Sequence, residues 1–74
     1  MRISYDREVG ALSIVFMDAT VTSTQIADGI AAEYDEQGRL AGFEVLDALK
    51  RFGDESTLRQ IVLEGVGPTN LATT

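Results

Sequence analysis

Two segments in which apolar and polar residues alternate, residues 29–35 and 40–46, stand on either side of a short polar stretch. A period of two is typical of strands that bury one side. The stretch between them, Glu36-Gln37-Gly38, is rich in turn-forming residues and ends in a glycine that can adopt the left-handed conformation. The pattern predicts an antiparallel hairpin with Gly38 in a bulged turn. Loops of three and of four residues both fit, which leaves the register open.

Two further strands are predicted near the N-terminus. Residues 1–6 alternate, with Met1, Ile3 and Tyr5 on one side. Residues 11–17 follow after a polar connection, and they are largely apolar on both sides. A strand with two apolar sides is typical of the centre of a sheet or of an interface, so we expect one side to contact a second copy of the chain. The apolar residues of that side are Ala11, Val15 and Met17.

Residues 18–28 carry a weaker signal. They are rich in Thr and other β-branched residues but lack a clean alternation. This composition suits a loop with a short, irregular strand, or an edge strand, where Ser and Thr are tolerated.

The segment after residue 46 is predicted to be mainly helical. Asp47 precedes residues 48–52 and can cap a short helical turn through its carboxylate, and Gly53 would end that turn. Asp54 is a second candidate N-cap, for a helix over residues 55–64. Three consecutive aliphatic residues near the end of that segment also favour a strand, so both structures stay open there.

Together these elements predict an α+β domain. Its core is a small antiparallel sheet of three to four strands, a β-meander, and a short C-terminal helical segment covers one face of the sheet. A chain of 74 residues is enough for one domain. We expect this domain to span residues 1–67 and residues 68–74 to form a flexible tail.

The residue types that are missing restrict the chemistry. The chain has no Cys, His or Trp, which excludes a thiolate nucleophile, a disulfide, a zinc–thiolate site and a histidine general base. We therefore predict no catalytic residue, no cofactor and no enzymatic activity. Small domains often compensate for a thin core with disulfides, metals or self-association. Self-association is the route open to this chain, with a homodimer as the first expectation.

The net charge of −6 is concentrated in the middle of the chain. Residues 28–47 contain six acidic residues and one arginine, so this stretch carries a net charge of −5. The charge argues against nucleic acid as a partner, because binding phosphates needs clustered Lys and Arg. A basic protein partner suits such a surface. The simpler interpretation is a solvated acidic surface that keeps the chain in solution.

A membrane location is not predicted. No apolar run approaches the roughly 20 residues that span a bilayer. The first six residues alternate and include an acid, which differs from a signal peptide. We expect a cytoplasmic protein.

Three carboxylates are the candidates for a metal site: Asp35, Glu44 and Asp47. If the hairpin brought them together, their oxygen atoms could bind Mg²⁺ or Ca²⁺. The alternative is structural, with Glu44 on the solvent side of its strand and Asp47 as a helix cap.

Three short blocks of sequence resemble those of a known family. The blocks are Tyr5-Asp6 leading into Ala11-Leu12, then Gly29 with Tyr34-Asp35 and Gly38, then Gly42 with Glu44-Val45-Leu46-Asp47-Ala48. In these blocks, and over residues 1–52, the chain resembles the domain of unknown function family 2283, which comprises small bacterial proteins. That family tends to have Ser after the final Asp-Ala, where this chain has Leu49. The resemblance implies one short domain and implies no particular activity.

These observations predict a non-enzymatic protein-interaction module that acts as a homo-oligomer. A basic protein is the expected kind of further partner, bound by an acidic mini-protein in the way that antitoxins neutralise their targets. The alternative is a module that binds a small molecule or a divalent metal at a site between subunits.

Overall fold

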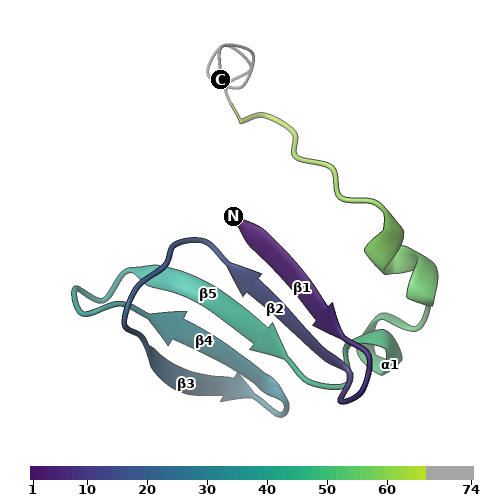
Figure 1. Ribbon diagram of the computed structural model, residues 1–74, viewed down its shortest axis with the longest axis horizontal. Helices are drawn as coiled ribbons and strands as arrows, with labels where there is room; N and C mark the ends of the chain where they lie inside the picture. Colours follow the sequence, from purple (N-terminus) through teal and green to yellow (C-terminus); the bar gives the residue numbers. More distant parts are fainter. Residues whose placement is uncertain (67–74) are drawn as a thin grey trace.

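The protein is described by a computed structural model, in which residues 1–66 are placed. These residues form one five-stranded sheet followed by two short helical segments (Figure 1). The elements are β1 (Arg2–Asp6), β2 (Ala11–Val15), β3 (Thr22–Ala27), β4 (Ile30–Tyr34), β5 (Leu40–Val45), α1 (Ala48–Phe52) and the 3₁₀ helix η1 (Glu55–Arg59). Every pair of neighbouring strands is antiparallel.

The sheet is larger than the predicted sheet of three to four strands, and it is not a meander throughout. The strand order is β1-β2-β5-β4-β3, so β2 lies beside β5 although two strands separate them in the sequence. The fifth strand is β3, which lies at one edge and is exposed at every residue. An exposed edge strand needs no apolar side, which is why its sequence lacks a clear alternation.

The hairpin between β4 and β5 has the predicted turn. Gly38 is left-handed, with φ of 78°, and its N–H donates to the Asp35 carbonyl over 3.0 Å. The Asp35 N–H donates to the Arg39 carbonyl over 2.9 Å, and Tyr34 pairs with Leu40. The pairing shifts next to this turn, as expected for a bulge. The register that the sequence left open is therefore set by a connection over residues 35–39.

The pairing of the strands divides the sheet into two unlike faces. Because successive side chains of a strand point to opposite sides, paired residues share a face. The apolar face is formed by Ile3, Tyr5, Leu12, Ile14, Phe43, Val45, Ile30, Ala32 and Thr24. The polar face is formed by Arg2, Ser4, Ser13, Val15, Gly42, Glu44, Ala31, Glu33, Ser23 and Gln25.

Very few large side chains are buried in this arrangement. Among residues 1–66 the buried apolar residues are Leu12, Ala32, Ala41 and Ala48. Phe43, Ile14 and Val45 are only half-buried. The Cα atoms extend over 37 × 34 × 19 Å, and Figure 1 shows a single layer of strands seen face-on. The apolar face has no second layer over most of its area.

The predicted caps of the C-terminal segment are partly correct. The Asp54 carboxylate accepts from the Ser56 N–H over 2.9 Å, and Gly53 ends α1 in the left-handed conformation. The prediction for Asp47 was wrong, because its side chain makes no capping hydrogen bond and its backbone is itself left-handed, with φ of 51°. In that conformation the carboxylate does not cap the first turn.

The predicted long helix after Asp54 is also wrong. The helical part is a five-residue 3₁₀ helix, and residues 60–64 have no regular secondary structure. Neither the helix nor the strand alternative for residues 61–63 is present. In Figure 1 the chain runs past the β1 edge after η1, and it does not cross the sheet. The helical segment therefore covers only part of the face that it was predicted to cover.

Two further predictions concern the C-terminal tail and the absence of a membrane-spanning segment. The predicted tail over residues 68–74 lies outside the described residues. In the part of the chain that is described, no helix has the length and apolar character needed to cross a bilayer.

Candidate functional site

The apolar face opens into a groove beside β1 and β2. The groove has a volume of about 410 Å³ and lies between the sheet and the C-terminal segment. Its walls are Ile3, Tyr5, Leu12, Ile14, Phe52, Thr57, Leu58 and Ile61. The sheet contributes half of these residues and the helical segment with its continuation contributes the rest. The groove is therefore the place where the cover of the apolar face is incomplete.

Several large side chains of this face remain in contact with solvent. Ile3 is 37% exposed and Phe16, which follows β2, is 38% exposed. Phe16 packs edge-on against Phe43, with ring centroids 6.0 Å apart. None of the strand residues that form the apolar face is charged. An exposed, uncharged, aromatic-containing patch of this kind is typical of a surface that binds protein.

The polar face carries a second concavity, at the end of the sheet next to α1. This cleft has a volume of about 350 Å³. Its walls are Gln25, Asp28, Gly29, Ile30, Ala31, Glu44, Leu46, Asp47 and Arg51. Three of these residues are acidic and one is a cation, so the cleft offers charged groups of both signs to a polar ligand.

Arg51 of α1 holds this cleft together. Its Nε donates to the Leu46 carbonyl over 2.8 Å, and its Nη2 donates to the Asp28 carbonyl. The guanidinium passes so close to Gly29 that a Cβ there would lie 2.2 Å from Nη2. The Leu46 N–H in turn donates to the Gly29 carbonyl over 2.8 Å. Arg51 therefore ties the β3–β4 turn to the end of β5 through two of the five N–H groups of its guanidinium.

Asp47 has the least favourable backbone conformation of the cleft. Among residues 1–66 it is the only residue other than glycine with a positive φ. Such a conformation costs on the order of 1–3 kcal/mol for a residue with a side chain. The position is held on both sides, because the Leu46 N–H donates to the Gly29 carbonyl over 2.8 Å and the Ala48 N–H donates to the Gly10 carbonyl over 3.0 Å. The carboxylate of Asp47 is left free of any role as a helix cap.

The three predicted metal ligands are not brought together. Glu44 and Asp47 both line the cleft on the polar face. Asp35 lies at the other end of the hairpin, in the turn between β4 and β5. Within residues 1–66 no group of three or more acidic side chains is arranged to hold a metal ion.

The carboxylate of Asp35 is occupied by its own turn. It accepts from the backbone N–H groups of Arg39, over 2.8 Å, and of Gln37, over 2.9 Å. The Arg39 Nε lies 2.8 Å from its second oxygen. The bond from the Arg39 N–H is the main reason why the pKa of Asp35 is lowered from its usual value, although desolvation acts in the opposite direction. Asp35 is therefore a turn residue in this structure.

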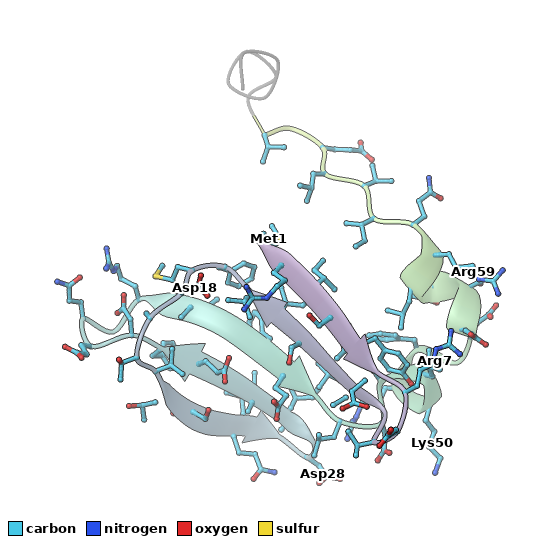
Figure 2. All side chains as sticks on the ribbon, in the orientation of Figure 1. Met1, Arg7, Asp18, Asp28, Lys50 and Arg59 are labelled. Carbon is cyan, nitrogen blue, oxygen red and sulfur yellow. The ribbon has the colours of Figure 1, made fainter. Side chains whose placement is uncertain are left out.

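The sequence interpretation missed the role of Arg51 and the openness of the apolar face. Arg51 was not recognised because its partners are backbone carbonyls that lie up to 23 residues away in the chain. Gly29 gave no specific signal for Arg51, because it lies in the turn before β4 and its positive φ of 72° by itself favours glycine. Figure 2 shows further basic side chains, Arg7, Lys50 and Arg59, at the end of the molecule that carries α1 and η1.

Comparison with known proteins identifies the family of the chain but no function. The model of the family described as "Protein of unknown function (DUF2283)" matches residues 2–48, which include all five strands and the start of α1. No curated protein and no solved structure matches the chain. The resemblance seen in the three sequence blocks is thus confirmed, and the chain belongs to the DUF2283 family of proteins of unknown function.

Proposed function

We propose that this chain is a cytoplasmic, non-enzymatic interaction module that works as a homodimer, in which two copies stack their apolar faces. The observation that carries the proposal is the composition of the core. One leucine and three alanines are the buried apolar residues among residues 1–66, while a face with two Phe, three Ile and one Val stays partly open. A second copy would bury that face.

The chemistry of the face favours a second copy over a basic partner. The chain has a net charge of −6, so two copies repel each other wherever their acidic residues meet. The apolar face has no charged strand residue, and two such faces can stack at the usual sheet spacing of about 10 Å without bringing like charges together. A basic partner would need acidic side chains to contact, and these lie elsewhere.

Acidic side chains suited to a basic protein lie on the polar face and around the β4–β5 hairpin. Glu33 and Glu44 are on the polar face, and Asp35 and Glu36 belong to the turn. In a dimer built through the apolar faces, the two polar faces point outward. We propose that they contact a basic protein, in a complex that salt above physiological strength weakens.

A second candidate function is the binding of a small polar molecule or a divalent cation in the cleft of Glu44, Asp47 and Arg51. The observation in its favour is Asp47, which holds a strained backbone while its carboxylate has no capping partner. In a dimer that stacks apolar faces, this cleft lies on the outside. A ligand site between subunits would therefore need a different dimer.

The two candidates are separated by substitutions at adjacent positions of β5. Phe43→Lys and Glu44→Lys introduce the same cation on opposite faces of one strand. We expect sedimentation velocity to find a dimer for the unmodified chain and for Glu44→Lys, and a monomer for Phe43→Lys. Ile3→Lys, at the edge of the sheet and already 37% exposed, provides a second disruption that interferes less with folding.

Two outcomes would count against the homodimer. One is an unmodified chain that stays monomeric at millimolar concentration. The other is a dimer that persists in both apolar-face variants while circular dichroism shows intact strands. The ligand candidate is tested separately by thermal shift with Mg²⁺ or Ca²⁺. It requires a shift that Glu44→Gln removes and that Glu36→Gln, in the distant turn, leaves unchanged.

A further inference from the structure

The chain after η1 presents a run of apolar side chains with little to cover them. Ile61, Val62 and Leu63 are 59%, 61% and 60% exposed. The backbone enters this run in an extended conformation, since Gln60 has φ of −142° and ψ of 132°. An extended, uncovered, β-branched run is a hazard for aggregation unless a partner covers it. We call residues 60–64 the C-terminal arm.

Two contacts hold the start of η1, the element that precedes the C-terminal arm. The Asp54 cap defines the start of η1, and Arg7 forms an ion pair with Glu55 over 3.7 Å. From there the arm runs outward past β1 (Figure 1). Only its first apolar residue, Ile61, reaches the groove of its own chain.

The arm would enlarge the interface of a dimer built from stacked sheets. Five strands spaced by about 4.8 Å, each with about five residues rising about 3.3 Å, give a face with a flat area of about 400 Å² per copy. Stable interfaces bury about 800 Å² of accessible surface per partner. Ile61, Val62 and Leu63, which are 59%, 61% and 60% exposed, would add apolar surface from each copy to such an interface.

We propose that the C-terminal arm of each copy packs into the groove beside β1 and β2 of the second copy. This inference rests on the proposed homodimer and names the segment that completes it. Alternation along an extended chain puts Leu63 on the same side as Ile61, and Val62 on the other side. Ile61 shows which side of the arm fits a groove of this kind. Leu63 lies on that side but does not line the groove of its own chain, so it is the side chain that enters the equivalent groove of the partner.

The inference predicts unequal effects of two neighbouring substitutions. Leu63→Ser should weaken the dimer about tenfold or more, because it removes a large apolar group from the interface. Val62→Ser is the matched control, since it starts from the same exposure and should change the dimer dissociation constant much less. Equal effects of the two substitutions would contradict the assigned side of the arm.

Cross-linking tests the placement of the arm directly, without background from native thiols, because the chain has no cysteine. A tagged Ile3→Cys chain is mixed with an untagged Leu63→Cys chain and oxidised mildly. We expect a covalent heterodimer on a non-reducing gel, formed faster than in a mixture of Ile3→Cys and Val62→Cys. The double variant Ile3→Cys/Leu63→Cys should likewise yield covalent dimers.

The other outcomes are separable when the same samples are sedimented. Two outcomes would overturn the placement of the arm without contradicting the homodimer. In one, the double variant forms its disulfide within a single chain. In the other, the mixed variants form a non-covalent dimer but no disulfide between the two chains. A sample that sediments only as a monomer would overturn both the arm and the homodimer.

Discussion

The two faces of the sheet are built from the same five strands, yet they differ in charge and in how far the rest of the chain covers them. The polar face carries Arg2, Glu33 and Glu44, and one end of it is closed by hydrogen bonds from Arg51. The apolar face has no charged strand residue and ends in an open groove. One face is therefore closed at one end by side chains of the chain itself, and the other stays open to solvent beside β1 and β2.

This difference shows where the stability of so small a domain has to come from. Large apolar side chains contribute about 1.5–3 kcal/mol each when they are fully buried. In residues 1–66 the only buried one is Leu12. In the proposed dimer the remaining large residues of the apolar face would become buried as well, so we expect folding and dimerisation to be coupled.

The largest expected effect comes from a cation introduced on the apolar face of β2, compared with the same cation on its polar face. Ile14→Lys should abolish the dimer and lower the free energy of unfolding by at least about 2 kcal/mol, because it buries an unpaired charge. Ser13→Lys should change that free energy by less than about 0.5 kcal/mol, since it faces solvent opposite Glu44. Urea unfolding combined with sedimentation measures both effects. Similar losses in the two variants would erase the distinction between the faces.

A smaller effect is expected where strands approach closely on the polar face. A Cβ at Gly42 would lie 2.4 Å from the Ile14 carbonyl oxygen and 3.2 Å from the Glu33 Oε1. Gly42→Ala should therefore cost about 1–3 kcal/mol in thermal or urea unfolding, because a backbone atom cannot move aside cheaply. Gly38→Ala is the comparison. A Cβ at Gly38 would meet no other atom, so Gly38→Ala should lower the free energy of unfolding only by the cost of placing alanine in the left-handed conformation, roughly 1–2 kcal/mol.

Replacing the strained residue of the polar-face cleft should be mildly favourable. Asp47→Gly removes the side chain that disfavours the left-handed backbone, and no capping bond is lost. We expect the free energy of unfolding to rise by up to about 1 kcal/mol and the thermal midpoint to increase. A fall in stability would mean that the Asp47 carboxylate makes a stabilising interaction on the polar face.

The smallest expected effect is on the pH dependence of stability, and it comes from Asp35 in the β4–β5 turn. The pKa of Asp35 is lowered below 3.8, chiefly by the Arg39 N–H. The ionised carboxylate therefore stabilises the fold above that pH, and this contribution is lost as the pH falls through the lowered pKa. Asp35→Asn should be less stable than the unmodified chain at pH 7 and should lose less further stability on acidification. Urea midpoints at neutral and acidic pH measure this difference, and parallel profiles would contradict it.

Much of the sheet could be predicted because local sequence determines it. The alternation in residues 1–6 and 40–46 and the glycine of the hairpin turn depend on neighbours along the chain. The strand order could not be predicted, because the contact between β2 and β5 joins segments far apart in the sequence. The edge strand β3 was ambiguous because strands exposed on both sides have no period to detect.

The site was less predictable than the fold. The expectation that a second copy covers Ala11, Val15 and Met17 stays a prediction. The pairing places Ala11 and Val15 on the face of Arg2, Ser4 and Glu44, and the homodimer proposed above uses the opposite face. A strand that is apolar on both sides does not tell which side stays open. That depends on the path of the chain after residue 53, and 3₁₀ geometry is poorly specified by periodicity.

Sedimentation equilibrium of the unmodified chain, from micromolar to millimolar concentration, tests the central claim most directly. The account predicts a reversible dimer with twice the 8.0 kDa mass of one chain, together with a thermal midpoint that rises with concentration. A folded monomer of 8.0 kDa over the whole range, with a midpoint independent of concentration, would contradict it.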